Sequence, residues 1–273
     1  MGKIIFLDID GTIRGFSGMI PDSAREAIAK ARQNGHKICI SSGRPYFQVP
    51  GMLPGLKFDG VISGSGSYVS YEGECLRHKY ITQFTYLALC NYLTQHGCVF
   101  ELMTHNNYYV LQQSVEEFLT IGREIQTALG ETAANFVDDE PTVIESLLDV
   151  YEIEKILFFS ETLSLEDVKR TWDTCFYIVP SSVPCGNRIA GEITPANVTK
   201  AAGILSILEK SGHEIADVIA IGDSDNDIDM LKLAGRGIAM GNGNDAVKAV
   251  ADYVTLPLDQ DGLYHAFVHE GLV

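Results

Sequence analysis

Several features that mark common classes of protein are missing from this chain. Its 273 residues contain no apolar stretch close to the roughly 20 residues of a membrane-spanning helix. The apolar run at the N-terminus stops at Asp8, which is too early for a secretion signal. The six cysteines form no CxxC pair and have no zinc-type spacing with histidine, so we expect reduced thiols. Together these absences favour a cytoplasmic protein.

Basic residues are also scarce. The chain has 20 Lys and Arg against 36 Asp and Glu, and its net charge is −16. Affinity for nucleic acids and for anionic lipid surfaces comes largely from Lys and Arg, so this charge argues against both as partners. The hydrophobic fraction of 46% is ample for a real core, and the length fits one large domain or two of ordinary size.

The hydropathy pattern near the N-terminus is typical of an open α/β sheet. Short apolar runs at 3–7, 36–40 and 60–63 predict buried strands, and the periodic stretch 24–34 predicts a helix between the first two. Strands that alternate with helices form parallel sheets with right-handed crossovers. We therefore expect an α/β fold with a Rossmann-like parallel-sheet core domain.

The pattern changes from about residue 84 onward. A helical stretch is followed by two alternating strands, at 99–103 and 108–112, which indicate an α+β unit. The alternation of helices and buried strands seen near the N-terminus returns with a helix at 199–211 and a strand at 218–221. We therefore predict a core domain formed by residues 1–82 and 187–273, with an α+β domain inserted at 83–186.

Two groups of acidic residues follow apolar strands. Asp8 and Asp10 come directly after the first strand, and residues two apart on a strand point to the same side. The run from Gly222 to Asp227 follows the strand at 218–221. Ligands bind at the carboxyl edge of open α/β sheets, and a few carboxylates there suit Mg²⁺. The structural alternative is that these acids only form a turn and cap a helix.

A hydroxyl and a lysine complete the candidate groups. Ser42 and Gly43 end the second strand, just before Arg44 and Pro45, and free backbone amides at such a point form a phosphate-sized anion site. Ser-Gly pairs are also common in ordinary loops. Lys200 opens a helix, where a cation is unusual because the helix N-terminus is already positive, and a nearby anion would explain it. A solvated surface lysine is the alternative.

Taken in order, these motifs resemble those of the haloacid dehalogenase superfamily. They are Asp-x-Asp-Gly-Thr at 8–12, Ser42 before Gly-Arg, the isolated Lys200, and Gly-Asp-x-x-Asn-Asp at 222–227. The segments at 239–243 and 259–262 resemble the Cof-like phosphatase branch, whose cap domain of type IIB is inserted between the second and third motifs. The resemblance spans essentially the whole chain. It departs at Ser65, which stands where the family has the Asn of an Asn-Gly pair.

The resemblance implies a Mg²⁺-dependent phosphatase that acts on a small phosphorylated metabolite, with a sugar phosphate as the expected class. Asp8 would be the nucleophile that forms an aspartyl-phosphate, and Asp10 would be the general acid and base. The phosphoryl group would be bound by Ser42, Gly43, Lys200 and Asn226. The ion would be held by the Asp8 carboxylate, the Asp10 carbonyl and Asp223, with Asp227 and Arg44 in support.

Two other functions use similar motifs. A phosphomannomutase-like phosphotransferase shares Asp-x-Asp-Gly-Thr and a similar cap, and a phospho-accepting signalling module uses an acidic cluster, a hydroxyl and a lysine. Asp10 argues against the signalling module, because an acid two residues after the nucleophile equips the site to turn over.

We expect a monomer or a weak homodimer. His78, His96 and His105 lie far from the motifs and are interpreted as surface or cap-structural residues.

Overall fold

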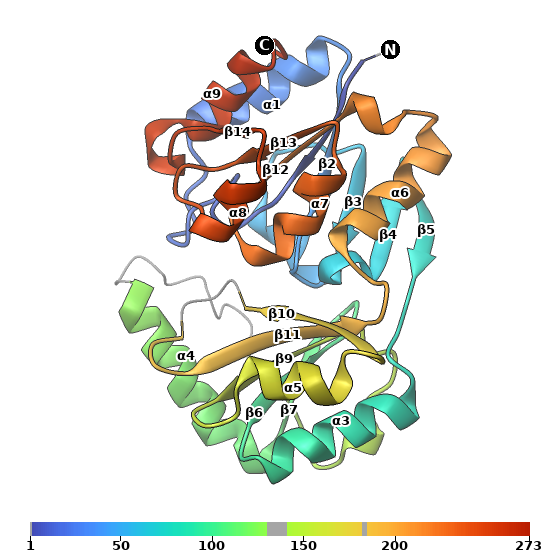
Figure 1. Cartoon of the computed structure of the whole chain (residues 1–273), viewed down its shortest axis with the longest axis vertical. Helices are drawn as coiled ribbons and strands as arrows, with labels where there is room; N and C mark the ends of the chain where they lie inside the picture. Colours follow the sequence, from blue (N-terminus) through green and yellow to red (C-terminus); the bar gives the residue numbers. More distant parts are fainter. Residues whose placement is uncertain (1, 130–140, 182–184) are drawn as a thin grey trace.

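The computed structural model describes residues 2–129, 141–181 and 185–273. Over these residues the chain forms two lobes, each built on one sheet (Figure 1). Both termini lie in the lobe of the first sheet. The chain crosses to the second sheet after β5 (Glu74–His78) and returns before α6 (Lys200–Ser211). The predicted α/β core with an inserted α+β unit is therefore confirmed.

The first sheet has eight strands in the order β14-β13-β12-β1-β2-β3-β4-β5. The strands from β14 to β3 run parallel, and β4 and β5 extend the sheet in antiparallel fashion. Besides β5, they are β1 (Ile4–Leu7), β2 (Lys37–Ser41), β3 (Gly60–Ser63), β4 (Tyr68–Tyr71), β12 (Val218–Gly222), β13 (Arg236–Ala239) and β14 (Tyr253–Val254). The central strands are continuous apolar runs because helices cover both faces of the sheet.

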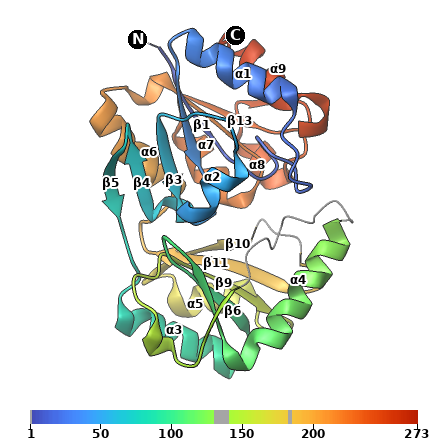
Figure 2. The ribbon, with the colours of Figure 1, turned by 180° about the vertical axis from the view of Figure 1, so that it is seen from behind.

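The helices of this lobe form two layers (Figure 2). Ile5 and Leu7 pack toward the layer of α1 (Asp22–Gln33) and α9 (Gly262–His269). Ile4 and Phe6 pack on the opposite face, toward α6, α7 (Ile228–Leu233) and α8 (Asp245–Val250). This alternation is the period of two that a strand imposes on its side chains. A short α2 (Val49–Met52) follows β2 and packs with the first layer.

The second sheet has six strands in the order β10-β11-β9-β6-β7-β8 and is antiparallel except between β7 and β8. They are β6 (Val99–Met103), β7 (Tyr108–Leu111), β8 (Thr142–Ile144), β9 (Lys155–Ser160), β10 (Phe176–Pro180) and β11 (Ile189–Pro195). Ile156 and Phe158 pack with α3 (Gln83–Gln95) and α5 (Leu165–Trp172). Leu157 and Phe159 pack on the other face with α4 (Val115–Leu129).

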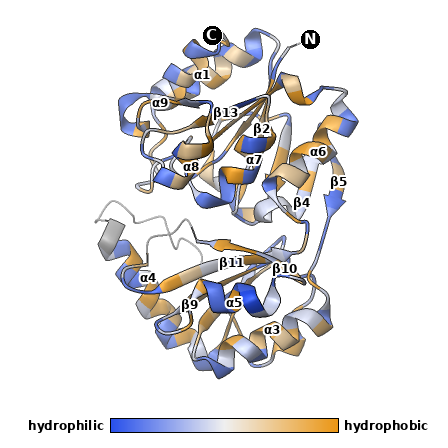
Figure 3. Cartoon of the chain, in the orientation of Figure 1, coloured by the Kyte–Doolittle hydropathy of each residue, from blue (hydrophilic) through white to orange (hydrophobic). Residues whose placement is uncertain are grey.

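Hydropathy along the chain follows these layers: the central strands of the first sheet are largely hydrophobic, whereas its edge strand β5 and the outer helix faces are largely hydrophilic (Figure 3). In the part of the chain that the structure describes, no helix is both long enough and apolar enough to cross a membrane.

The sequence-based expectation ends the insertion at residue 186. β11 lies beyond that point, yet it pairs with β9 and β10 of the second sheet. A strand with unremarkable local hydropathy joins a sheet according to its long-range pairing, which periodicity does not reveal. We propose that the division between the domains follows the two sheets, so that the return to the first sheet comes between Pro195 and Lys200.

Candidate active site

The predicted catalytic residues lie at the carboxyl edge of the first sheet. Asp8 follows β1 directly, and its backbone N–H donates to the carbonyl of Ile221 on the neighbouring β12. Asp223 comes just after the end of that same strand. Two adjacent parallel strands therefore deliver one carboxylate each to one place, as the sequence motifs predict.

Lys200 is the cation at the centre of this edge. Its side chain is completely buried, and its ammonium group donates to Asp8 Oδ1 and to Asp227 Oδ1 at 2.6 Å each. It is the first residue of α6, where Thr199 caps the helix by accepting from the N–H of Ala202. The two carboxylates explain why a cation is stable at this helix start, and the surface-lysine alternative is wrong.

The acidic cluster carries more negative charge than Lys200 compensates. Oxygens of Asp8, Asp223 and Asp227 lie within 4.8 Å of one another. Burial raises the pKa of Asp8 to about 8, even though the positive charge of Lys200 opposes this shift. Burial and the charge of Asp8 likewise raise the pKa of Asp223 well above its ordinary value. Three carboxylates and one ammonium leave two negative charges uncompensated when all are ionised.

A divalent cation fits this cluster. Oδ1 of Asp223 is a buried oxygen with no hydrogen-bond donor within the described part of the chain. The oxygens of Asp227 are already used, because Oδ1 accepts from Lys200 and Oδ2 accepts from the backbone N–H groups of Asp223 and Ser224. Asp8 and Asp223 are therefore the available carboxylate ligands, whereas Asp227 holds the loop in place. Oxygen ligands of this kind suit Mg²⁺.

Gly11 allows the two strand ends to approach so closely. Its φ of +84° lies in the left-handed region, and a Cβ at this position would come 2.2 Å from Asp223 Oδ2. Any side chain would therefore both strain the backbone and displace the Asp223 carboxylate.

The loop after β2 forms the second wall of the site. Ser42 is buried, and its hydroxyl accepts from the N–H of Arg44 at 3.1 Å. The Arg44 side chain reaches back to Asp10, with Nε donating to Oδ2 at 2.9 Å and Nη2 donating to Oδ1 at 3.3 Å. This two-point contact fixes the carboxylate of Asp10 beside Asp8. The sequence did not predict that Arg44 and Asp10 would pair.

The segment that follows β12 forms the third wall of the site and carries Asn226. The hydroxyl of Ser224 donates to its Oδ1 at 3.0 Å, and its Nδ2 lies 3.3 Å from the place that a Cβ of Gly43 would occupy. The amide donor therefore faces the loop after β2. The structure thus brings together all nine predicted site residues: Asp8, Asp10, Ser42, Gly43, Arg44, Lys200, Asp223, Asn226 and Asp227.

The second lobe supplies residues that the sequence analysis did not find. A cavity of about 110 Å³ opens over Asp8 and Asp10, and Glu101, Lys155 and Glu192 from the second sheet line it. Lys155 donates to Glu192 Oε2 at 3.1 Å and to the carbonyl of Gly43 at 2.7 Å, so it joins the two lobes at the site. No local motif marked these residues, because each is the one charged residue of a largely apolar strand.

The rest of the cavity wall is largely apolar. Tyr108 and Phe118 are buried in the second lobe, and they also line the cavity with Phe16 and Phe159. Burial raises the pKa of Glu101 to about 7, against the charges of Lys155 and Arg44.

The departure at Ser65 has a structural counterpart. Ser65 has a φ of 55°, a conformation in which Asn is enriched among non-glycine residues. Its hydroxyl donates to Glu192 Oε2 at 3.3 Å, so the loop after β3 contacts the second sheet. The side chains of Asp225 and Asp229 accept hydrogen bonds from Asn244 and Tyr177, respectively.

Comparison with known proteins identifies relatives along nearly the whole chain. The sequence profile of the haloacid dehalogenase-like hydrolases matches residues 5–267. The chain is 28% identical over 268 residues to the 5-amino-6-(5-phospho-D-ribitylamino)uracil phosphatase YcsE of Bacillus subtilis (strain 168), and this alignment covers 98% of this chain and 95% of the relative.

Solved structures are similar over both lobes. BT1666 from Bacteroides thetaiotaomicron, one of the phosphatases of the haloalkanoate superfamily, matches with a TM-score of 0.82 and 25% identity, covering 100% of this chain and 96% of that one. The subclass IIB sugar phosphatase BT4131 matches with a TM-score of 0.79 and 27% identity, covering 99% of this chain and 100% of that one.

Proposed function

The chain belongs to the haloacid dehalogenase-like hydrolase family and is a phosphatase, and from this premise we propose that it hydrolyses a small sugar phosphate in a Mg²⁺-dependent reaction through an aspartyl-phosphate on Asp8. The observation that carries the proposal is the buried Lys200 held between Asp8 and Asp227, beside an Asp223 oxygen that lacks a donor. A buried lysine and a carboxylate oxygen able to bind a cation, both beside the nucleophile, are groups that phosphoryl transfer uses, and this supports the proposal.

The first half of the reaction is the attack of the Asp8 carboxylate on phosphorus. A P–O bond to Asp8 forms while the bond to the sugar oxygen breaks, and Asp10 donates the proton that this oxygen takes up. Lys200 keeps the Asp8 carboxylate oriented through its hydrogen bond to Oδ1. Ser42 and Asn226 line the cavity and would donate to the oxygens of the transferred group.

The second half is hydrolysis of the aspartyl-phosphate. Asp10, now ionised, accepts a proton from the attacking water, and the bond between phosphorus and Asp8 breaks to release inorganic phosphate. The Arg44 contact holds the Asp10 carboxylate for both steps. Mg²⁺ bound by the carboxylates of Asp8 and Asp223 and by the carbonyl of Asp10 would neutralise the charge of the phosphoryl oxygens.

The cavity supports a polyol as the leaving group. Glu101, Lys155 and Glu192 offer acceptors and donors for hydroxyl groups at the cavity wall contributed by the second lobe, opposite Asp8 and Asp10. The named activities of the relatives point the same way, since one is a sugar phosphatase and another acts on a phosphoribityl compound. A cavity of about 110 Å³ fits a small substrate rather than a polymer.

The test of the covalent step uses Asp8→Asn, with Asp225→Asn as the matched control on a nearby loop. Asp225 pairs with the side chain of Asn244, so its loss should leave turnover within about twofold. Asp8→Asn should lower turnover by at least about a thousandfold, because the amide lacks the nucleophilic oxygen. Acid quenching with radiolabelled substrate should trap phosphate on the wild-type protein at Asp8. Phosphate release by Asp8→Asn above about one percent of wild type would refute the assignment.

The role of Asp10 is tested by changing the leaving group. Asp10→Asn should nearly abolish the single-turnover release of a sugar alcohol, yet release of a nitrophenolate should persist because that leaving group needs little protonation. An equal loss with both substrates would count against Asp10 as the acid. The substrate class is tested with a panel of sugar phosphates, nucleotides and pyridoxal phosphate, and preference for a nucleotide would overturn the sugar-phosphate proposal.

A further inference from the structure

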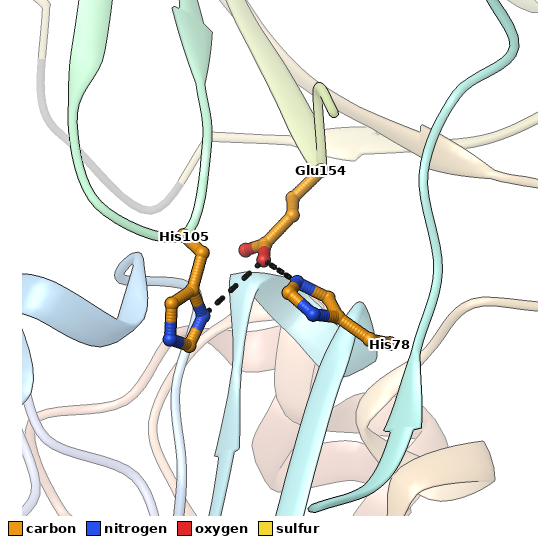
Figure 4. A group of neighbouring side chains, drawn as sticks. All are labelled: His78, His105 and Glu154. Atoms are coloured by element: carbon orange, nitrogen blue, oxygen red, sulfur yellow. Dashed lines mark hydrogen bonds and ion pairs between the residues drawn. The ribbon is translucent and has the colours of Figure 1, made fainter. Parts of the chain in front are cut away.

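A second cluster of ligating side chains lies at the junction of the two lobes, apart from the active site. It consists of His78, His105 and Glu154 (Figure 4). His78 ends β5 of the first sheet, His105 lies in the turn between β6 and β7, and Glu154 directly precedes β9. The three ligating atoms lie within 4.8 Å of one another, so two histidines that the sequence analysis interpreted as surface or cap-structural residues share one cluster with Glu154.

The geometry centres on one oxygen of Glu154. Its Oε1 lies 2.5 Å from Nε2 of His78 and 3.5 Å from Nδ1 of His105, and both rings point toward it (Figure 4). The aromatic rings of Tyr46 and Tyr68 pack against His105, with centroids 4.6 Å and 4.4 Å away. These contacts hold the imidazole of His105 in its orientation.

The cluster has polar atoms that its protein neighbours do not satisfy. The side chain of Glu154 is completely buried, and its Oε2 forms no hydrogen bond within the described residues. Nδ1 of His105 is likewise a buried atom without a hydrogen-bond partner there, and it faces Glu154. Among the described residues, only the two histidines come within ion-pair distance of Glu154. A buried carboxyl oxygen and a buried ring nitrogen without a hydrogen-bond partner destabilise the folded protein unless a ligand binds them.

Protonation of the three groups is compatible with a cation. Burial lowers the pKa of His78 and of His105, so both rings are neutral near pH 7 and each offers a lone pair. Burial raises the pKa of Glu154 to about 8, as expected for a carboxyl group that lacks a cation. Binding of a divalent ion would displace that proton.

We propose that His78, His105 and Glu154 form a binding site for a transition-metal ion of the zinc type. Two imidazoles and one carboxylate are a ligand set that Zn²⁺ and its neighbours bind, with a further position left for water. The hydroxyl of Tyr80 lies 2.9 Å from Nδ1 of His78 and accepts from that nitrogen when Nε2 serves as the ligand. Such a partner orients the ring, as the outer contacts of metal-bound histidines usually do.

The site lies at the junction of the two lobes, so a bound ion would affect how the lobes are held together. His78 belongs to the first sheet, whereas His105 and Glu154 lie in the second lobe, next to strands of its sheet. Direct contacts already surround the junction: the hydroxyl of Ser67 donates to the carbonyl of Glu154, and the N–H of Phe47 donates to the carbonyl of His105. A metal ion there would add ligand bonds across the same junction and restrain movement of one lobe against the other.

The experiment uses Co²⁺ as a spectroscopic probe on metal-free protein kept in excess Mg²⁺, which occupies the active-site carboxylates. Wild type should bind one Co²⁺ per chain with the visible absorption of a four- or five-coordinate ion, and Zn²⁺ should displace it. A thiolate charge-transfer band in the near ultraviolet would place the ion on a cysteine and overturn the assignment. Absence of a tightly bound ion would overturn it as well.

Variants locate the site. Tyr80→Phe removes only a partner that orients His78, and it should weaken Co²⁺ binding by about ten- to a hundredfold. Glu154→Gln and His105→Asn remove a ligand, so each should weaken binding by at least about a hundredfold. Asp223→Asn should leave the band unchanged, which separates this site from the catalytic one. His96→Asn is the matched control, because His96 follows the last residue of α3 and its Nδ1 lies 2.8 Å from the carbonyl of Tyr92, outside the cluster. An unchanged affinity in Glu154→Gln, or a lost band in His96→Asn, would refute the proposal.

A second readout follows the junction itself. Zn²⁺ at saturating concentration should raise the melting temperature of wild type, since a ligand that binds only the folded state stabilises it. The same addition should leave Glu154→Gln unaffected if that variant folds with the wild-type circular dichroism spectrum. An equal rise in both proteins would show that Zn²⁺ acts elsewhere and would overturn the assignment.

Discussion

Replacing Lys200 by Met tests the charge balance on which the active site depends. The ammonium group is completely buried and bonds to Asp8 and to Asp227 at 2.6 Å each. Burial alone would lower the pKa of Lys200, but the charges of Asp227 and Asp8 raise it above its ordinary value, so the lysine is fully charged. Lys200→Met keeps the length and volume of the chain and removes only the charge and its hydrogen bonds.

The expected cost follows from what the substitution leaves behind. Three carboxylates would remain within 4.8 Å of one another without a cation. Two unit charges about 4 Å apart repel by about 4 kcal/mol at an effective dielectric constant of 20, and the protein would avoid part of this by binding protons. Loss of one partner from a buried ion pair typically costs about 3–5 kcal/mol, and we expect a loss in that range.

The assay is urea unfolding in EDTA near pH 7.5, and α6 supplies its own control. Lys210 lies on the same helix and pairs with Glu74 at 2.6 Å, but its side chain is 47% exposed and that of Glu74 is 59% exposed. Lys210→Met should therefore change stability by less than about 1 kcal/mol. Adding Asp227→Asn to Lys200→Met should restore part of the loss, because it removes one unpaired carboxylate. A loss below about 1 kcal/mol for Lys200→Met would refute the reasoning.

Three further predictions concern the metal, the strand ends and the cavity. EDTA should abolish phosphatase activity and Mg²⁺ should restore it, whereas Ca²⁺ should not, because its larger and looser coordination shell could engage both oxygens of Asp8; equal activity with Ca²⁺ would contradict this. Gly11→Ala should destabilise the fold by about 1–3 kcal/mol and raise the Mg²⁺ concentration for half activity at least about tenfold, because its methyl group would displace Asp223; an unchanged Mg²⁺ titration would show that the close approach is unnecessary. Burial raises the pKa of Glu101 from 4.5 to about 7 in the folded protein, so its contribution to stability is present below pH 4.5 and is lost as the pH rises through 7. Relative to Glu101→Gln, the unfolding free energy of wild type should therefore fall by about 3 kcal/mol by about pH 8, and parallel pH profiles would disprove it.

Much of the fold could be predicted from local sequence because its signals are local. The strands β1, β3 and β6 follow from short apolar or alternating runs, and their observed bounds differ from the predicted ones by one residue at most. The inserted position of the second sheet was predicted from the change in the hydropathy pattern near residue 84. The hairpin of β4 and β5 and the strand β11 were missed, since their residues pair with distant strands and carry no strong period of their own.

The nine predicted site residues also came from local signals. Each stands at the end of a strand or the start of a helix, and the parallel topology brings such points to one edge of the sheet. Sequence alone therefore indicated which residues meet there, although their individual roles stay proposals. It did not indicate how they pair, and the contacts of Arg44 with Asp10 and of Lys200 with Asp227 depend on side-chain directions that only the folded structure sets.

Only the tertiary structure placed the second lobe against the first. Glu101, Lys155 and Glu192 are each the one charged residue of a largely apolar strand. Nothing local distinguishes them from other charged residues until the second sheet faces the active site. His78, His105 and Glu154 are separated by up to 76 residues and lie within a few ångströms of one another because two sheets meet at that point. A local motif can reveal the functional residues at the end of one strand. A site formed between two sheets exists only after long-range strand pairing has positioned both sheets, so no local motif reveals it.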